Sequence, residues 1–113
     1  MKKFLVLYHA PMSAMEQMAN VPKEQQAEGM MAWMQWAKSC GDKLIDMGTP
    51  LANGQQIHPG GKSEPSNKDV AGYSILQAEN IDEAKKLLRG HPHLGWNAAC
   101  SIEIHETMPL PGT

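Results

Sequence analysis

The chain has 113 residues, enough for one domain that buries about 65% of its unfolded surface, and we expect a single domain over residues 1–113. Its formal net charge is −2, and no run of Lys and Arg is longer than a pair, so neither a nucleic acid nor a membrane surface is an expected partner. Cys40 and Cys100 lack the spacing of a paired cysteine motif, and the first apolar run is too short for a signal peptide. We therefore expect a cytoplasmic protein.

The first elements are a strand and two helical segments. Residues Lys3 to His9 are almost continuously apolar, which predicts a central strand covered on both faces. A capping-box pattern at Ser13 to Glu16 predicts a short helical turn that ends near Asn20. Pro22 is then well placed to begin a longer helix that runs to about Cys40.

The long helix has an apolar stripe at helical spacing, which predicts its core-facing side. The stripe consists of Ala27, Met30, Met31, Met34, Ala37 and Leu44. Trp33 and Trp36 fall beside it and widen the apolar surface. They either cover a partner subunit or remain partly exposed.

The second half of the chain begins with less regular segments. Leu51 to His58 could form a strand interrupted at Asn53 and Gly54, and Pro59 to Asp69 is rich in Gly, Ser and Pro, which predicts an exposed hairpin loop. Val70 to Ala78 is then a clear strand.

A capped helix and a last strand follow. Asn80 and Glu83 supply the N-cap and capping-box residues of the helix, and Gly90 and Pro92 end it. Ser101 to Thr107 then alternates as a strand, with Ile102 and Ile104 toward the core and Glu103, His105 and Thr107 on the other side.

The order strand, helix, strand, strand, helix, strand predicts an α+β fold of the ferredoxin-like βαββαβ type. In this fold both helices cover one face of an antiparallel sheet. The first strand is apolar on both sides, so its second face also needs cover. A homodimer that packs sheet against sheet is the simplest way to provide it.

The predicted topology brings four histidines to one end of the sheet. His9, His58, His91 and His93 should meet there together with Asp69, whereas His105 should lie at the other end. Imidazoles near a carboxylate can transfer protons at neutral pH, so we predict an acid–base site. His91, held between a helix end and Pro92, is its leading candidate, with His9 and Asp69 beside it; the alternative is that these loop histidines are simply solvated.

The same histidines offer a weaker case for a metal. His91 and His93, with His9 or His58, could supply three zinc ligands, but no HExxH or paired cysteine motif supports such a site. Nucleophile motifs and a glycine-rich phosphate loop that opens a helix are also missing from the sequence. We therefore expect folding without a metal or other cofactor.

Several short motifs, in this order and spacing, resemble the YCII-related domain family, which includes the DGPF-type proteins. They are Ala71-Gly72-Tyr73, Asp82-Glu83-Ala84, His91-Pro92-His93, Ser101-Ile102-Glu103-Ile104 and Met108-Pro109. The resemblance implies a dimeric α+β barrel with a pocket between sheet and helices. Some members carry a His on the first long helix and an Asp just before the proline that follows the second helix, suggested as a catalytic pair. The corresponding residues here are Met31 and His91, so the chemistry must differ or be absent.

Two functions follow from these observations. The first is an enzyme for an unknown small molecule, an isomerase, lyase or hydrolase, with His91, His9 and Asp69 as catalytic residues and His58, His93 and Tyr73 as substrate-binding residues. The second is a non-catalytic dimer module, either ligand-binding or regulatory, that uses the same pocket for a small ligand. An oxygenase, as found on other dimeric α+β barrels, has only fold analogy behind it.

Overall fold

The computed structural model describes residues 1–11, 21–96 and 98–112, so the helical turn predicted from Ser13 to Asn20 lies outside the described residues. The elements follow in the order β1 (Lys2–His9), α2 (Lys23–Cys40), η1 (Gly41–Lys43), β2 (Leu44–Asp46), β3 (Gln55–Ile57), β4 (Ser63–Pro65), β5 (Val70–Ala78), α3 (Ile81–Leu88), η2 (Pro92–Gly95) and β6 (Ser101–Glu106). The predicted ends of the long helix at Cys40 and of the strand at Ala78 are confirmed. None of the helices in the described part of the chain combines the length and apolar character needed to cross a membrane.

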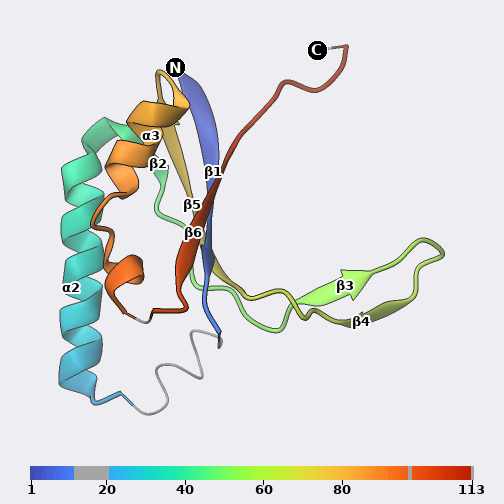
Figure 1. Cartoon of the computed structure of the whole chain (residues 1–113), viewed down its shortest axis with the longest axis horizontal. Coiled ribbons are helices and arrows are strands. Elements are labelled where there is room, and N and C mark those ends of the chain that lie inside the picture. Colours follow the sequence, from blue (N-terminus) through green and yellow to red (C-terminus); the bar gives the residue numbers. More distant parts are fainter. Residues whose placement is uncertain (12–20, 97, 113) are drawn as a thin grey trace.

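The main sheet has the strand order β2-β5-β1-β6, and its neighbouring strands are antiparallel. This is the ferredoxin-like order, in which the first and third sheet strands lie in the centre. Both helices cover the same face of the sheet, as predicted (Figure 1). The short strands β3 and β4 form a separate two-stranded arm that projects away from the helices.

The core lies between the sheet and the two helices. Phe4, Val6 and Tyr8 of β1 are buried on the helix side, whereas Leu5 and Leu7 point to the opposite face, where they are only half-buried. This alternation follows from the two-residue period of a strand. At the N-terminus of α3, the Asn80 side chain accepts a hydrogen bond from the backbone N–H of Glu83 at 2.9 Å, so the predicted cap is confirmed.

The core face of α2 differs from the prediction. The methionines of the predicted stripe are exposed, at 51% for Met30, 61% for Met31 and 55% for Met34, whereas Trp36 is 7% exposed. The buried side is formed by Trp33, Trp36, Ala37 and Cys40, which also follow the i, i+3, i+4, i+7 spacing. The helix therefore has two apolar stripes, and the indoles reach the sheet.

The second strand of the sheet also lies elsewhere than predicted. Helix α2 ends at Gly41, whose φ of +59° is unfavourable for other residues, and the strand β2 follows at Leu44–Asp46. The predicted strand from Leu51 to His58 instead contributes only Gln55–Ile57 to the arm. Gly48 connects β2 to the following loop with a φ of +76°, and a Cβ atom there would lie 1.7 Å from the main-chain oxygen of Tyr73.

Candidate functional site

A cavity of about 530 Å³ lies between the N-terminal half of α2, one end of the central strands β1 and β5, and η2. Aromatic and apolar side chains form much of its wall, among them Tyr8, Trp33, Met30, Met47 and Trp96. Residues of the loop after β2 and of the start of β5 complete the lining. Its volume is within the range of about 300–1,000 Å³ that is usual for small-molecule sites.

His93 is the histidine that lines this cavity. Its ring is 3% exposed, and its Nε2 atom lies 2.8 Å from the main-chain oxygen of His9. A carbonyl oxygen only accepts hydrogen bonds, so Nε2 of the neutral ring carries the hydrogen and Nδ1 holds the lone pair. His93 is thus oriented by the backbone of β1 and retains a basic nitrogen.

His91 was predicted to lie at the rim of the pocket. In the structure it lies in the packed interior. Its side chain is 1% exposed, and its ring centroid lies 4.4 Å from that of Trp33, 4.3 Å from that of Trp36 and 5.0 Å from that of Tyr8. Its Nδ1 atom accepts a hydrogen bond from the backbone N–H of His93 at 3.0 Å. His91 therefore fixes the main chain that carries His93.

The environment of His91 keeps its ring neutral. Burial, and to a smaller extent the nearby His93, lowers the pKa of His91 to about 4. Because Nδ1 accepts a hydrogen bond, the hydrogen of the neutral ring is on Nε2, and this atom has no hydrogen-bond partner among the described residues. The surrounding indole and phenol faces provide only weak N–H to π contacts for such a group.

Tyr8 lines the cavity, packs beside His91 and is itself held by a hydrogen-bond chain. The Oγ atom of Ser74 donates to the main-chain oxygen of Met47 at 2.7 Å, so the Tyr8 hydroxyl, 2.8 Å from Oγ, is the donor of the second bond. Burial raises the pKa of Tyr8, and the phenol stays neutral. Tyr8 is consequently a wall of the cavity and a poor candidate for its base.

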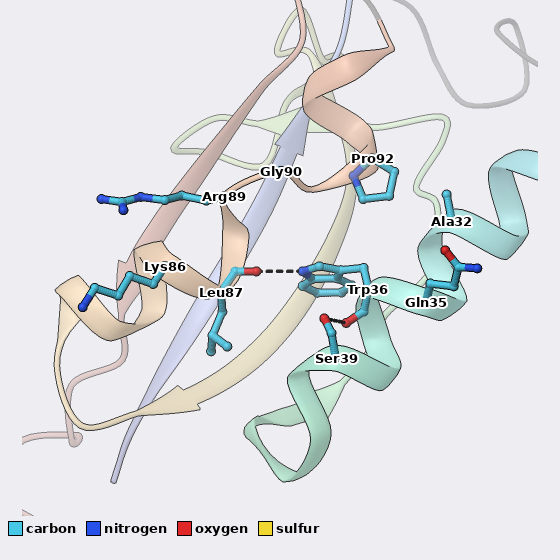
Figure 2. Close-up of a pocket in the computed structure, with 9 residues that line it drawn as sticks. All are labelled: Ala32, Gln35, Trp36, Ser39, Lys86, Leu87, Arg89, Gly90 and Pro92. Atoms are coloured by element: carbon cyan, nitrogen blue, oxygen red, sulfur yellow. Dashed lines mark hydrogen bonds between the residues drawn. The ribbon is translucent and has the colours of Figure 1, made fainter.

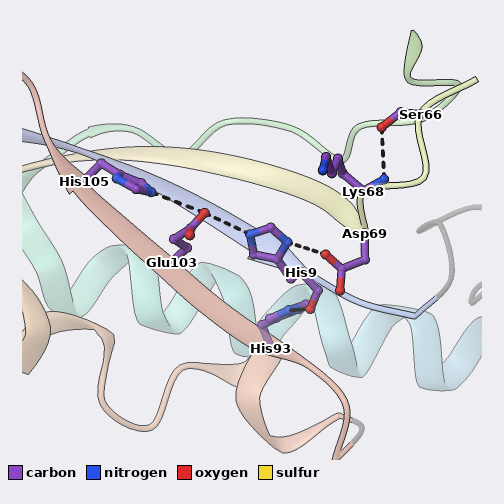
Figure 3. A network of polar contacts seen from close by, with 7 residues as sticks. All are labelled: His9, Ser66, Lys68, Asp69, His93, Glu103 and His105. Atoms are coloured by element: carbon purple, nitrogen blue, oxygen red, sulfur yellow. Dashed lines mark hydrogen bonds and ion pairs between the residues drawn. The ribbon is translucent and has the colours of Figure 1, made fainter. Parts of the chain in front are cut away.

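The side chain of His9 lies on the open face of the sheet, opposite α2 and α3, in a chain of ion pairs (Figure 3). Its Nδ1 atom is 2.5 Å from Asp69, and its Nε2 atom is 3.2 Å from Oε1 of Glu103, which also lies 3.2 Å from Nε2 of His105. Burial lowers the pKa of His9, but the hydrogen bonds to Asp69 and Glu103 outweigh this effect and the pKa is raised. His105, predicted at the other end of the sheet, is thus linked to His9 through Glu103.

The remaining predicted residues lie apart from this network. Nε2 of His58 pairs with Glu64 at 3.0 Å on the arm. Tyr73 is among the residues that line the cavity, but its hydroxyl donates to Asp46 at 3.2 Å. The predicted histidine cluster is therefore divided between the cavity and core, the open sheet face and the arm. Glu103 and Trp96 were not predicted as site residues, although the alternation of β6 already placed Glu103 on the face opposite the core.

A second hollow, of about 520 Å³, lies between α2 and α3 (Figure 2). Trp36 is its aromatic residue, and the indole N–H already donates to the main-chain oxygen of Leu87 at 2.8 Å. The side chains of Lys86 and Arg89 extend away from the indole. Across residues 1–11, 21–96 and 98–112, no three His, Cys, Asp or Glu side chains are arranged to hold a metal ion. The cavity beside His93 is thus the better candidate site.

Comparison with known proteins identifies the fold. No protein-family model matches the chain, and no curated protein does either. Among solved structures, the chain is similar to 5-chloro-2-hydroxyhydroquinone dehydrochlorinase from Burkholderia phenoliruptrix in complex with 2,5-dihydroxybenzoquinone, with a TM-score of 0.51 and 16% sequence identity over 89% of this chain and 90% of that chain. The fold is ferredoxin-like, of the kind found in dimeric α+β barrels. At this identity the likeness concerns the fold alone.

Proposed function

We propose that this chain is a single YCII-related domain that binds a small organic molecule in the cavity and acts on it by acid–base chemistry, with His93 as the base. One observation carries the proposal: His93 lines the cavity while its Nε2–H is anchored on the backbone of β1, which leaves Nδ1 as the basic atom. A general base needs this kind of fixed orientation within reach of a bound ligand. The reaction class is that of an isomerase, lyase or hydrolase.

The other predicted catalytic residues support His93 from a distance in this proposal. His91 holds the backbone N–H of His93, and the main-chain oxygen of His9 holds its ring. Asp69 in turn holds the side chain of His9 on the open face. The solved neighbour is an enzyme with a small quinone bound, which is compatible with a small ligand in a fold of this kind.

We also propose that the protein is a homodimer that packs its open sheet faces together. On this face Leu5, Leu7 and Ile75 are half-buried, and neither α2 nor α3 covers them. The second copy would remove these apolar side chains from water, which is the dominant favourable term in association.

A non-catalytic binding module is the second candidate. It is favoured by the cavity lining, in which His93 is the one imidazole and Glu28 the one carboxylate among the described residues. Many acid–base enzymes place two titratable groups at the reacting atoms. The two candidates differ in whether a bound ligand exchanges its protons.

Calorimetric titration with small hydroxyquinones and enolisable ketones, followed by NMR of their hydrogen–deuterium exchange, tests the proposal. Gly29 lines the cavity, and a Cβ atom there would meet nothing within 4 Å, so Gly29→Phe should fill the cavity and abolish binding without distorting α2. Ala27→Phe, on an exposed position of the same helix, is the matched control and should bind normally.

The histidine is tested by a conservative replacement. In His93→Gln the amide can still donate to the oxygen of His9 but offers no basic nitrogen, so ligand should bind while exchange falls by at least about 100-fold, the usual lower contribution of a general base. His58→Gln on the arm is the control. Exchange that survives His93→Gln would exclude His93 as the base, and binding without any exchange in the wild type would favour the binding module.

A further inference from the structure

The charged side chains that are known to line the cavity beside His93 are acidic only. Its described lining contains no Lys or Arg and one carboxylate, that of Glu28, which is exposed on α2. The residues known to line the cavity therefore offer no cationic side chain to an anionic ligand.

From this distribution of charge we propose that the cavity selects uncharged, flat aromatic ligands that carry a hydroxyl group. Glu28 excludes ligands of the same shape that carry a carboxylate or a phosphate group instead. The inference rests on the proposed function, because it names the ligand class of the same cavity. It goes further because it gives Glu28, which takes no part in the proposed acid–base chemistry, a role in ligand specificity.

The walls explain the preference for a flat ring. The rings of Tyr8 and Trp33 meet edge to face with centroids 4.9 Å apart, and Trp96, also in the lining, is 49% exposed. Aromatic faces bind another ring in offset or edge-to-face geometry. A hydroxyl on such a ring can donate to Nδ1 of His93, the atom that its hydrogen bond to His9 leaves as an acceptor.

The cost of charge explains the exclusion of anions. A carboxylate that enters a partly apolar cavity loses hydration and recovers it only if it meets a cation or several donors. Glu28 also lies in the lining, and its carboxylate is exposed, so it repels a second carboxylate largely through solvent, which weakens binding about fivefold (about 1 kcal/mol) for unit charges about 4 Å apart. A phenol of the same shape avoids both costs, because it is neutral at pH 7 with a pKa near about 10.

The test uses three ligands that share one ring system, namely 2-naphthol, 2-naphthoate and 2-naphthylmethylammonium, titrated calorimetrically into the full chain at pH 7. We expect 2-naphthol to bind at least about tenfold more tightly than 2-naphthoate, since the carboxylate loses hydration without meeting a cation and is also repelled by Glu28. Glu28→Gln should narrow this ratio at least about threefold. Glu24→Gln removes the same charge one turn earlier on α2, outside the lining, and should leave the ratio unchanged.

Three results would contradict the inference in distinguishable ways. Equal or tighter binding of 2-naphthoate, lost in Gly29→Phe, would overturn the charge selection and leave the cavity as the ligand site. Tightest binding of the ammonium ligand would show that Glu28 attracts cations instead of excluding anions. If no ligand depended on Gly29, the cavity would not be the site, and the proposed function would fail together with this inference.

Discussion

The buried His91 should make the protein sensitive to acid in a defined pH window. Its pKa is about 4 in the folded chain and near 6.5 when unfolded. Between these values the unfolded chain binds a proton that the folded chain does not, so the free energy of unfolding falls as the pH decreases from about 6.5 to about 4. Above pH 6.5 the contribution is fully present.

The size of the effect follows from the same two values. A difference of about 2.5 pH units at about 1.4 kcal/mol per unit gives about 3.5 kcal/mol in total, of which about 3 kcal/mol is lost between pH 7 and pH 4 because the folded His91 is only half-protonated at pH 4. The side chain is 1% exposed, so solvent screening reduces this value little. His9 acts in a different window, because its raised pKa gives stability that is complete below pH 6.5 and is lost only at higher pH.

His91→Asn isolates this contribution. An Asn oxygen can accept the backbone N–H of His93 as the imidazole does, since Asn is a good N-cap, but the amide does not titrate. Urea unfolding at fixed protein concentration and several pH values should show that the wild type loses about 3 kcal/mol more than His91→Asn between pH 7 and pH 4. His58→Asn removes a histidine from the arm and should keep the wild-type profile. Parallel profiles for wild type and His91→Asn would refute the assignment of the acid sensitivity to His91.

Three further predictions concern the turn after β2, the open sheet face and metals. Gly48→Ala combines an unfavourable φ with a Cβ atom 1.7 Å from the main-chain oxygen of Tyr73, so urea unfolding should show a free energy of unfolding that is lower by at least about 3 kcal/mol. The control is Gly60→Ala, which has a φ of +96° but no atom within 4 Å of the added Cβ atom, and its free energy of unfolding should fall clearly less. Leu7→Asp should convert a sedimenting dimer into monomer or unfold it, since it buries an unpaired charge, and a wild type with the mass of a single chain at micromolar concentration would argue against the dimer. The melting temperature should not change when a chelator is added, and stoichiometric zinc in untagged protein would instead support a metal site.

The elements with one clear sequence signal were predicted correctly. The strand β5 is apolar and ends at turn residues, and α3 has Asn80 as cap and Gly90 as stop, so local chemistry alone determines their ends. The face of α2 could not be predicted in the same way, because the helix has two apolar stripes at equal spacing. Only contact with the sheet decides between Met34 and Trp36, and that contact is a tertiary property.

Several residues of the candidate site could be named from the sequence, but their arrangement in space could not be predicted. The topology placed His9 near Asp69, and the structure pairs them, but two residues such as His91 and His93 can face different surroundings across a single proline. Whether a loop histidine is buried depends on the side chains that fill the space around it. For His91 these are Trp33 and Trp36, whose inward direction the stripe analysis did not establish.

Two adjacent residues of β1 connect the two surfaces for which we propose functions. Tyr8 faces the cavity, and His9 faces the open side of the sheet, because successive side chains of a strand alternate. The main-chain oxygen of His9 also orients the ring of His93, so a shift of the end of β1 changes the position of the proposed base. Packing of a second copy against the open face would restrain this strand end through Asp69 and Glu103. On this basis, a variant that disrupts the dimer should also reduce proton exchange in the cavity, even though no residue of the open-face network lines it.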